Sequence, residues 1–128
     1  MNRMTKPSKK GGPLDAFDWS KADAIVERIP RGRWASYGDV AVAAELPRSY
    51  AKAFGHHLAD ADLDGVWRVL SADGRPSPRF RLEERQSSGD IAEVISWLKE
   101  EGVRFDHKDR ARNHCQLDVR QLRRLITP

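Results

Sequence analysis

The chain has 128 residues, of which 39% are hydrophobic and 33% are charged, and this length suits one compact domain with a core of modest size. No apolar run approaches the roughly 20 residues that cross a bilayer, and residues 1–13 lack the hydrophobic stretch of a signal peptide. The single cysteine, Cys115, excludes an internal disulfide and a multi-thiolate metal site. We therefore expect a cytoplasmic protein without membrane contact, stabilised by packing alone.

The excess of positive charge lies at one end of the chain. The formal net charge is +4, and four basic residues near the start account for it: Arg3, Lys6, Lys9 and Lys10. The other 19 basic residues are balanced by 19 acidic ones. Residues 1–13, rich in Lys, Gly and Pro, are predicted to be a disordered basic arm, and residues 14–128 a neutral domain. Such an arm could contact phosphates or serve only as a solubilising tail.

The first part of the domain is predicted to be helical. Apolar residues at helical spacing predict a first helix over residues 20–29, which Pro30 ends. Ser36 and Asp39 have the spacing of a capping box at the start of a second helix. A third helix is predicted over residues 48–58, after a break at Leu-Pro. Two short helices with a tight break between them are typical of a helix-turn-helix.

The second half predicts a hairpin and two further helices. Residues 66–70 are apolar and β-prone, and a turn at Asp73-Gly74 separates them from residues 79–82, which predicts a hairpin or wing. A helix is expected from Asp90 to its terminator Gly102, and Asp118 can cap a short terminal helix. The predicted fold class is mainly α with a small β-hairpin, as in winged-helix-like helix-turn-helix DNA-binding domains.

Five short motifs follow one another along the chain: Ile29-Pro30-Arg31-Gly32, Ser36-Tyr37-Gly38-Asp39-Val40-Ala41, Lys52-Ala53-Phe54-Gly55, Trp67-Arg68-Val69-Leu70-Ser71-Ala72-Asp73-Gly74 and Glu100-Glu101-Gly102-Val103-Arg104-Phe105. Together they resemble the DNA-binding domain of O6-alkylguanine-DNA alkyltransferases, over roughly residues 17–122. The sequence has no counterpart of the N-terminal domain of the full-length repair enzymes. The resemblance therefore points to the alkyltransferase-like branch of that family.

Repair in that family depends on a Pro-Cys-His-Arg motif, whose thiolate takes the alkyl group from a flipped guanine. Aligning the family's Arg-Val pair on Arg68-Val69 places Val66 at the Cys position and Trp67 at the His position. A one-residue gap instead places Trp67 at the Cys position, where alkyltransferase-like proteins commonly carry Trp, and deletes the His. Both alignments remove alkyl transfer. Cys115 lies far along the chain, and we expect it to be inert, so the resemblance implies a non-enzymatic protein.

The resemblance also implies a set of DNA-binding residues. Tyr37 matches a Tyr that presses on the phosphate beside the target nucleotide, and a helix N-terminus at Ser36 and Tyr37 suits a phosphate; the alternative is a capping Ser and a core Tyr. Lys52 stands where the family has the Arg that fills the gap left by the flipped base, and it lacks the planar guanidinium. Arg48 is expected at backbone phosphate, and Arg68 is also assigned to DNA binding.

A lesion pocket is implied by the same resemblance. Val66 and Trp67 would line it, together with Arg79, which lies five positions beyond Gly74. The indole could offer a π face and the guanidinium could bond to guanine edges, whereas a purely structural Trp67 is the alternative. No metal or cofactor is expected, because the four histidines lack tight ligand spacing: His56, His57, His107 and His114.

These observations predict a monomeric, non-enzymatic protein that binds double-stranded DNA, recognises O6-alkylguanine by nucleotide flipping and flags it for nucleotide excision repair proteins. In a prokaryote it would be nucleoid-associated. One alternative is a winged-helix DNA-binding protein of architectural or regulatory type without lesion recognition. A third possibility is a repair enzyme that uses an unexpected thiol. A fourth is an interaction module that has lost DNA binding, and the acidic segment 60–64 favours it.

Overall fold

The protein is described by a computed structural model that covers residues 18–61, 63–76 and 88–127. Its elements are, in chain order, α1 (Ser20–Arg28), β2 (Ala35–Ser36), α2 (Tyr37–Ala43), the 3-10 helix η2 (Arg48–Tyr50), α3 (Ala51–Asp60), η3 (Val66–Arg68), β3 (Val69–Leu70), α4 (Ser88–Glu100), η4 (Asn113–Cys115) and α5 (Val119–Arg124). The fold is mainly helical with a small sheet, as the sequence predicts. None of the helices in these ranges is long and apolar enough to span a membrane. The predicted arm and its boundary with the domain lie outside the described residues.

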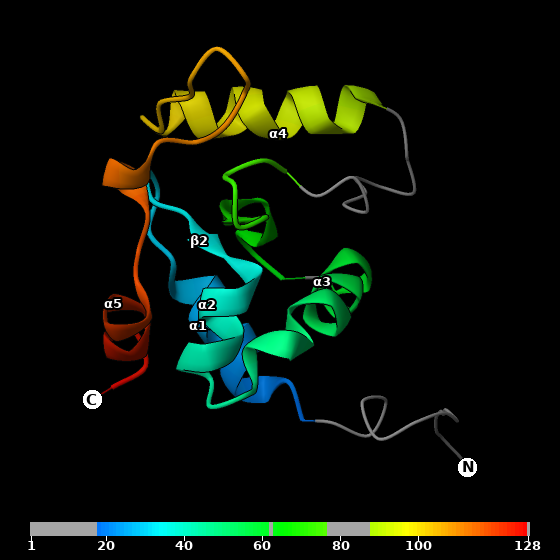
Figure 1. Ribbon diagram of the computed structural model, residues 1–128, viewed down its shortest axis with the longest axis vertical. Helices are drawn as coiled ribbons and strands as arrows, with labels where there is room; N and C mark the ends of the chain where they lie inside the picture. The colour runs from blue at the N-terminus through cyan, green and yellow to red at the C-terminus, as the bar shows by residue number, and fades with distance from the viewer. Residues whose placement is uncertain (1–17, 62, 77–87, 128) are drawn as a thin grey trace.

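The helix α2 lies between two other helices. Figure 1 shows α5 on one side of α2 and α3 on the other, with α4 across one end of the molecule. The turn between α2 and α3 is short and contains η2. This arrangement is the predicted helix-turn-helix, with α3 as its second helix.

Local signals place the helix ends where the sequence predicts them. Ile29 is extended, with ψ of 119°, because the residue before a proline is disfavoured in the α conformation, and α1 ends at Arg28. The Ser36 hydroxyl accepts a hydrogen bond from the Asp39 amide at 3.1 Å and caps α2. Asp118 and Gln121 form a reciprocal capping box at the start of α5.

The helix α4 differs from the prediction at its start. It begins at Ser88, two residues before the predicted Asp90. Its end is as predicted: Gly102 has a φ of +104°, and the Val103 amide donates to the Leu98 carbonyl at 3.0 Å. This left-handed glycine after the last turn is the common way to end a helix.

The predicted strand over residues 66–70 is wrong in its first three residues, which form η3. Gly65 precedes it in the left-handed conformation, with φ of +80°, and the Arg68 amide donates to the Gly65 carbonyl at 2.9 Å. Only β3 is extended, and it pairs in parallel with β2 through Ala35 opposite Val69. The predicted partner strand, residues 79–82, lies outside the described residues, and so the hairpin is not tested.

The predicted turn at Asp73-Gly74 is present. The Gly74 amide donates to the Ser71 carbonyl at 2.8 Å, and its φ is +88°. The Gly74 carbonyl accepts from the Ala111 amide at 2.8 Å, and a Cβ at this position would lie 2.8 Å from the Ala111 carbonyl oxygen. Glycine is therefore required here both by φ and by the close approach of a second backbone segment.

The buried side chains form two clusters. The helix-turn-helix core joins α1, α2, α3 and α5, and its members include Ile25, Val26, Ile29, Tyr37, Val40, Phe54, Leu58, Leu117 and Leu122. The α4 core lies beneath α4 and contains Trp34, Leu70, Val94, Leu98, Val103, Ala111 and Cys115. Val66 packs against both clusters, so η3 sits at their junction.

Candidate nucleic-acid interface

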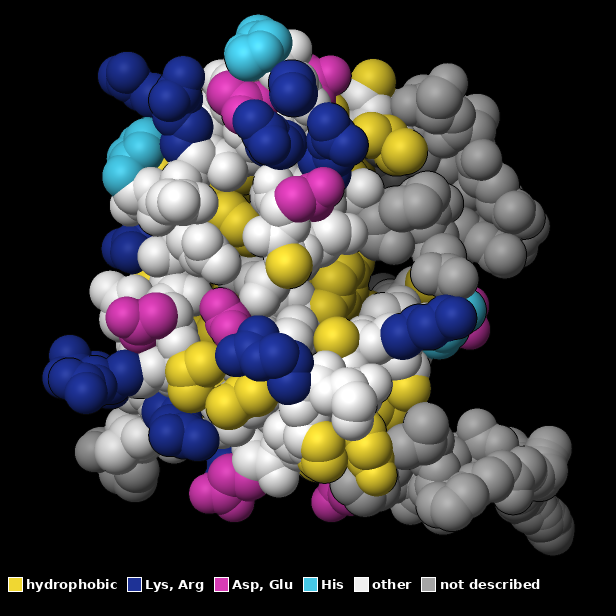
Figure 2. Space-filling model, viewed as in Figure 1, with side chains coloured by type: hydrophobic (Ala, Val, Ile, Leu, Met, Phe, Trp, Pro, Cys, Tyr) yellow, Lys and Arg dark blue, Asp and Glu magenta, His cyan; other side chains and the backbone are white. Residues whose placement is uncertain are grey.

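One face of α3 is exposed and basic. Lys52 and His56 are exposed and lie one helical turn apart, whereas Phe54 and Leu58 on the opposite side are buried in the helix-turn-helix core. We call Lys52 and His56 the α3 strip. Figure 2 shows basic (dark blue) and His (cyan) side chains beside acidic ones (magenta) at the edge of the molecule where α3 lies in Figure 1. Lys52 is thus exposed where a ligand could reach it, and its predicted place in the gap left by a flipped base stays a prediction.

Tyr37 borders one flank of α3. Its ring meets Phe54 edge-on, with centroids 6.3 Å apart, and a Cβ at Gly55 would lie 3.7 Å from the ring carbons Cδ1 and Cε1. Tyr37 is 9% exposed, so its ring belongs to the helix-turn-helix core. This packing fits the alternative of a core Tyr, and the predicted contact with a phosphate stays a prediction.

The start of α2 combines a buried cap with an exposed arginine. Ser36 is 3% exposed, and its hydroxyl is used by the Asp39 amide, as a capping Ser requires. Arg48 reaches back from η2, and its Nη2 lies 2.9 Å from the Asp39 carboxylate. Its side chain is 59% exposed. A Cβ at Gly38 would lie 2.8 Å from Arg48 Nη1, so glycine leaves room for the guanidinium over the first turn of α2.

The other flank of α3 is held against α1. His57 Nε2 lies 2.8 Å and 3.1 Å from the two carboxylate oxygens of Asp23. The Trp19 ring stacks on His57, with centroids 5.2 Å apart and an interplanar angle of 17°, and on Phe54 at 5.5 Å. We call Trp19, Asp23 and His57 the α1–α3 clasp. The clasp and Tyr37 fix the orientation of α3 from its two sides.

Arg68 is not on this face. Its Nε and Nη2 donate to the two carboxylate oxygens of Glu101 at 3.0 Å and 2.9 Å, and its Nη1 donates to the Ile29 carbonyl at 2.9 Å. Its side chain is only 12% exposed, and that of Glu101 only 4%. All three directions of the guanidinium fork are thus satisfied inside the protein. Arg68 thus links η3 to α4 and to the end of α1 in this structure, and its predicted contact with DNA stays a prediction.

Glu101 is a buried carboxylate with several hydrogen-bond partners, and the sequence did not single it out. It accepts from Arg68, from Trp67 Nε1 at 3.1 Å and from the Gly32 amide at 3.2 Å. Burial alone would raise the pKa of this carboxyl, but the hydrogen bonds from Arg68, Trp67 and Gly32 and the charge of Arg68 outweigh burial and lower the pKa. Its only sequence signal was membership of the Glu-Glu-Gly motif, because its partners are more than 30 residues away.

The predicted lesion-pocket residues lie partly within the described structure. Val66 and Trp67 are half-buried in η3, which packs against α1 and α4. The Trp67 ring meets Trp97 edge-on, with centroids 5.5 Å apart, and the Arg68 guanidinium lies 5.1 Å from its centroid. Arg79 lies outside the described residues. Trp67 is therefore held firmly in place, with its N–H directed to Glu101.

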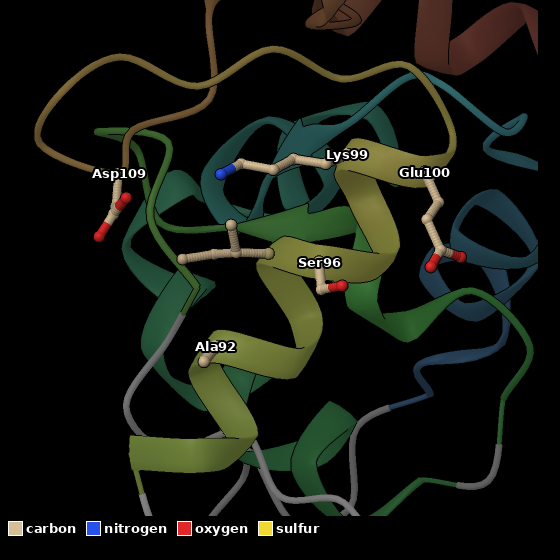
Figure 3. Close-up of a pocket in the computed structure, with 6 residues that line it drawn as sticks. Ala92, Ser96, Lys99, Glu100 and Asp109 are labelled. Carbon is tan, nitrogen blue, oxygen red and sulfur yellow. The ribbon is translucent and has the colours of Figure 1, made fainter.

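Two hollows in the described part of the chain are lined by other residues. A 540 Å³ hollow along α4 is lined by Ala92, Ile95, Ser96, Lys99, Glu100 and Asp109. Figure 3 shows Asp109 on a separate loop, across from the Lys99 side chain. A second hollow of 520 Å³ is lined by residues of the turn at Asp73, of the loop before η4 and of η4 itself, including Asp106, Arg110 and His114. Among the described residues, no three or more His, Cys, Asp or Glu side chains group as metal ligands.

Cys115 lies apart from the helix-turn-helix. It is 7% exposed and belongs to the α4 core, whereas Tyr37 and Phe54 belong to the helix-turn-helix core. Its carbonyl accepts from the Trp34 amide at 3.0 Å and from Arg33 Nε at 3.1 Å. The thiol is thus placed in a packed interior, on a segment that is hydrogen-bonded to the two residues before β2.

No protein-family model matches the chain, and no curated protein has a matching sequence. Among solved structures, the chain is similar to S. pombe Atl1, an alkyltransferase-like protein, in complex with damaged DNA containing O6-carboxymethylguanine. The chain has an Atl1-like fold. The likeness has a TM-score of 0.55 and 26% sequence identity, and it covers 69% of this chain and 78% of that protein. The mainly helical architecture with a small two-stranded sheet matches the helix-turn-helix, winged type of fold that the sequence predicts.

Proposed function

We propose that the chain binds double-stranded DNA and recognises O6-alkylguanine by nucleotide flipping, without transferring the alkyl group. The observation that carries this proposal is the likeness, over 69% of the chain, to S. pombe Atl1 in complex with DNA that contains O6-carboxymethylguanine. The family motifs on α2 and α3 support the proposal from the sequence side.

The α3 strip supplies the chemistry for the first contact. Lys52 is exposed between the two flanks that hold α3 in place, and Arg48 is 59% exposed beside the start of α2. Cations on this face bind backbone phosphates and release counterions, which positions the protein on the duplex without reading its sequence. Lys52 then occupies the gap left by the extruded base, and its compact charge does so less well than a planar guanidinium.

The absence of alkyl transfer is proposed from the residues at the motif position. Val66 and Trp67 carry neither a thiol nor an imidazole, and Cys115 is buried in the other hydrophobic cluster. An acceptor thiol needs access to the alkyl group, and Cys115 is only 7% exposed. Incubation with duplex carrying a labelled O6-alkyl group should leave Cys115 unlabelled; stoichiometric transfer to the protein would overturn this part of the proposal.

A protein that holds a lesion without removing it needs a second protein to complete repair. We therefore propose that the bound complex, with the protein as a monomer, marks the site for nucleotide excision repair, in the cytoplasm or at the nucleoid of a prokaryote. Pull-down with purified excision-repair proteins should depend on lesion-containing DNA. Equal recovery with undamaged DNA would contradict the marking role.

Titration of a short duplex with and without one O6-methylguanine tests the central proposal. We expect tighter binding to the lesion duplex, with affinity for both duplexes falling as salt rises. Lys52→Arg provides the matched variant, because it keeps the positive charge and adds a planar guanidinium at the same position, and it should tighten binding to both duplexes. Equal affinity of the wild-type protein for the two duplexes would refute lesion recognition.

A winged-helix DNA-binding protein of architectural or regulatory type is the second candidate. It is favoured by Lys52 in place of the family's Arg and by the Trp67 N–H, which is directed to Glu101. Under this alternative, selection from random DNA should enrich particular sequences, and the lesion should change affinity little. The two candidates are thus separated by the same titration and one selection experiment.

A further inference from the structure

A second basic surface lies on the loop that leads from α4 to η4. Residues 103–127 hold seven Lys or Arg and three Asp, whereas residues 18–61, which contain α1, α2 and α3, hold six basic and six acidic residues. Figure 1 shows this loop at the end of the molecule where α4 lies, away from α3. Figure 2 shows Lys and Arg side chains gathered at the same end. This excess of cations therefore lies outside the face that we propose for the DNA contact of α3.

Two arginines stand directly opposite each other in this loop. Phe105 and Ala111 form an antiparallel bridge, and next to it the Arg112 amide donates to the Arg104 carbonyl at 2.8 Å. Opposite residues of an antiparallel pair lie on the same side, and successive pairs alternate between the two sides. Ala111 and Phe105 pack into the α4 core, so Arg104 and Arg112 face outward, and both are exposed. We call Arg104 and Arg112 the arginine pair.

The arginine pair is a like-charge contact on a fixed support. Like charges directly opposite each other destabilise paired strands. The neighbouring cross-strand pair has opposite charges, and Arg110 Nε lies 2.9 Å from the Asp106 carboxylate. Within the described ranges, no ion pair joins either member of the arginine pair to an acidic residue. The backbone beneath is held by the core, because the Arg112 carbonyl accepts from Trp34 Nε1 at 3.0 Å. A bound anion would relieve the repulsion between the two guanidinium groups.

The hollow beside the arginine pair offers further polar groups. Arg112 lines this 520 Å³ hollow together with Asn113 and His114, and all three are exposed. The two acidic residues of the hollow are Asp73 and Asp106, and their carboxylates accept backbone amides at 3.1 Å and 3.0 Å. Both carboxylates thus have partners within the protein, while the arginine pair keeps its charge for a ligand.

The composition of this surface suits a nucleic acid better than a protein. The hydrophobic residues of the loop point inward: Val103 and Ala111 are buried, and Phe105 packs against the α4 core. Protein–protein interfaces have an apolar centre, whereas protein–DNA interfaces are polar and positively charged. Guanidinium groups match the geometry of phosphate oxygens. A phosphate backbone is therefore the ligand that fits the arginine pair.

We propose that the arginine pair, with Asn113 and His114 beside it, binds the phosphate backbone of a second DNA duplex while α3 contacts the first. The inference rests on the proposed function, because it takes α3 as the face that binds the first duplex. Since the loop lies away from α3, a straight duplex on α3 leaves the arginine pair accessible (Figure 1). One protein molecule then joins two duplexes.

Capture of a second duplex tests the inference. The protein is loaded onto an immobilised O6-methylguanine duplex, a labelled undamaged duplex is added, and the captured label per bound protein is measured over a range of salt concentrations. In the double variant Arg104→Gln/Arg112→Gln, capture should fall by about fivefold, and its slope against log salt should become less steep by about 2, because two phosphate contacts are lost. Affinity for the first duplex should stay within about twofold of the wild type.

The matched control removes two exposed arginines from α5, in the double variant Arg120→Gln/Arg124→Gln. This control should capture the labelled duplex as the wild type does. An equal loss in both double variants would show that total charge holds the second duplex, and would overturn the inference. The arginine-pair variant should be at least as stable in urea as the wild type, because a repulsion is removed. A clear loss of stability would instead assign the pair a structural role and overturn the inference.

Two further outcomes would overturn the inference. One is undiminished capture by the arginine-pair variant, as expected if a second copy of the protein holds the labelled duplex. The other is displacement of the labelled duplex by polyglutamate as readily as by unlabelled duplex of equal charge, which would show a surface for acidic chains in general. If the wild-type protein does not bind the immobilised duplex, the proposed function fails; if it binds there and captures no second duplex, only this inference fails.

Discussion

Arg68 and Arg48 show how differently one side chain is used in two regions of this molecule. Arg68 is 12% exposed and binds Glu101 in a two-pronged ion pair, whereas Arg48 is 59% exposed and makes one contact with Asp39. The first joins η3 to α4 across the interior, and the second lies on the surface beside α3. The presence of a basic residue in a motif therefore does not show whether it is structural or binds a ligand. Its partners and its exposure decide whether the charge is available to a ligand.

The largest expected effect is the loss of stability when the buried Arg68–Glu101 pair is broken. Glu101→Ala leaves Arg68 without its carboxylate in a nearly closed site, and should lower the free energy of unfolding by about 3–5 kcal/mol. Urea denaturation measures this change in the free energy of unfolding. Arg48→Ala is the matched surface variant and should cost about 1 kcal/mol or less. Similar losses in both variants would erase the distinction between the two regions.

A Ser36 variant tests whether the hydroxyl caps α2 or binds a phosphate. Ser36→Ala removes the cap of α2 and should lower the free energy of unfolding by about 0.5–2 kcal/mol. The exposed Ser96 in the middle of α4 provides the control, since Ser96→Ala should be neutral or slightly stabilising. A Ser36→Ala variant with normal stability and much weaker DNA binding would instead assign the hydroxyl to phosphate.

Lys52→Ala should have the opposite profile from Glu101→Ala. Stability should stay within about 0.5 kcal/mol of the wild type, because the side chain is exposed. Affinity should fall by about fivefold on plain and lesion duplexes alike, and the salt slope should become less steep by about 1. Fluorescence anisotropy at several salt concentrations measures both quantities. Unaltered affinity would remove the α3 strip from the binding face.

The smallest expected effect is the acid dependence of the buried pair. Because the pKa of Glu101 is lowered in the folded protein, its contribution to stability is fully present above its ordinary pKa of 4.5 and is lost as the pH falls below it. Asp106, whose pKa is lowered to about 2 chiefly by the Arg110 amide, acts in the same direction. Denaturation midpoints measured between pH 3 and 6 should fall with acid in the wild type, and less so in Glu101→Gln. Equal acid sensitivity in the wild type and in Glu101→Gln would contradict the account of Glu101.

The features that the sequence predicted well are those set by neighbours along the chain. The caps at Ser36 and Asp118, the stop before Pro30 and the terminator Gly102 all depend on hydrogen bonds or steric limits within a few residues. The exposed position of Lys52 likewise follows from helical spacing. The mainly helical fold and the helix-turn-helix could thus be predicted.

The errors concern contacts between distant segments. The parallel pairing of Ala35 with Val69 joins residues 34 apart, and the Arg68–Glu101 pair joins residues 33 apart. The residue types in the run 66–70 favour a strand. They do not indicate that residues 66–68 form the 3-10 helix η3, or that the Arg68 side chain is buried. Local patterns therefore predict the helices α2 and α3 that carry most of the candidate site, whereas they give no sign of the internal pairing of Arg68.

The location of the interface is tested most directly by following backbone amide signals in ¹H–¹⁵N spectra while the protein is titrated with an O6-methylguanine duplex. The account predicts that the largest shifts gather between residues 36 and 60, on α2, η2 and α3. It also predicts that the amides of Arg68 and Glu101 shift much less, because their side chains are paired inside the protein. Shifts concentrated on α5 or on the loop around Asp109, with α3 unaffected, would contradict it.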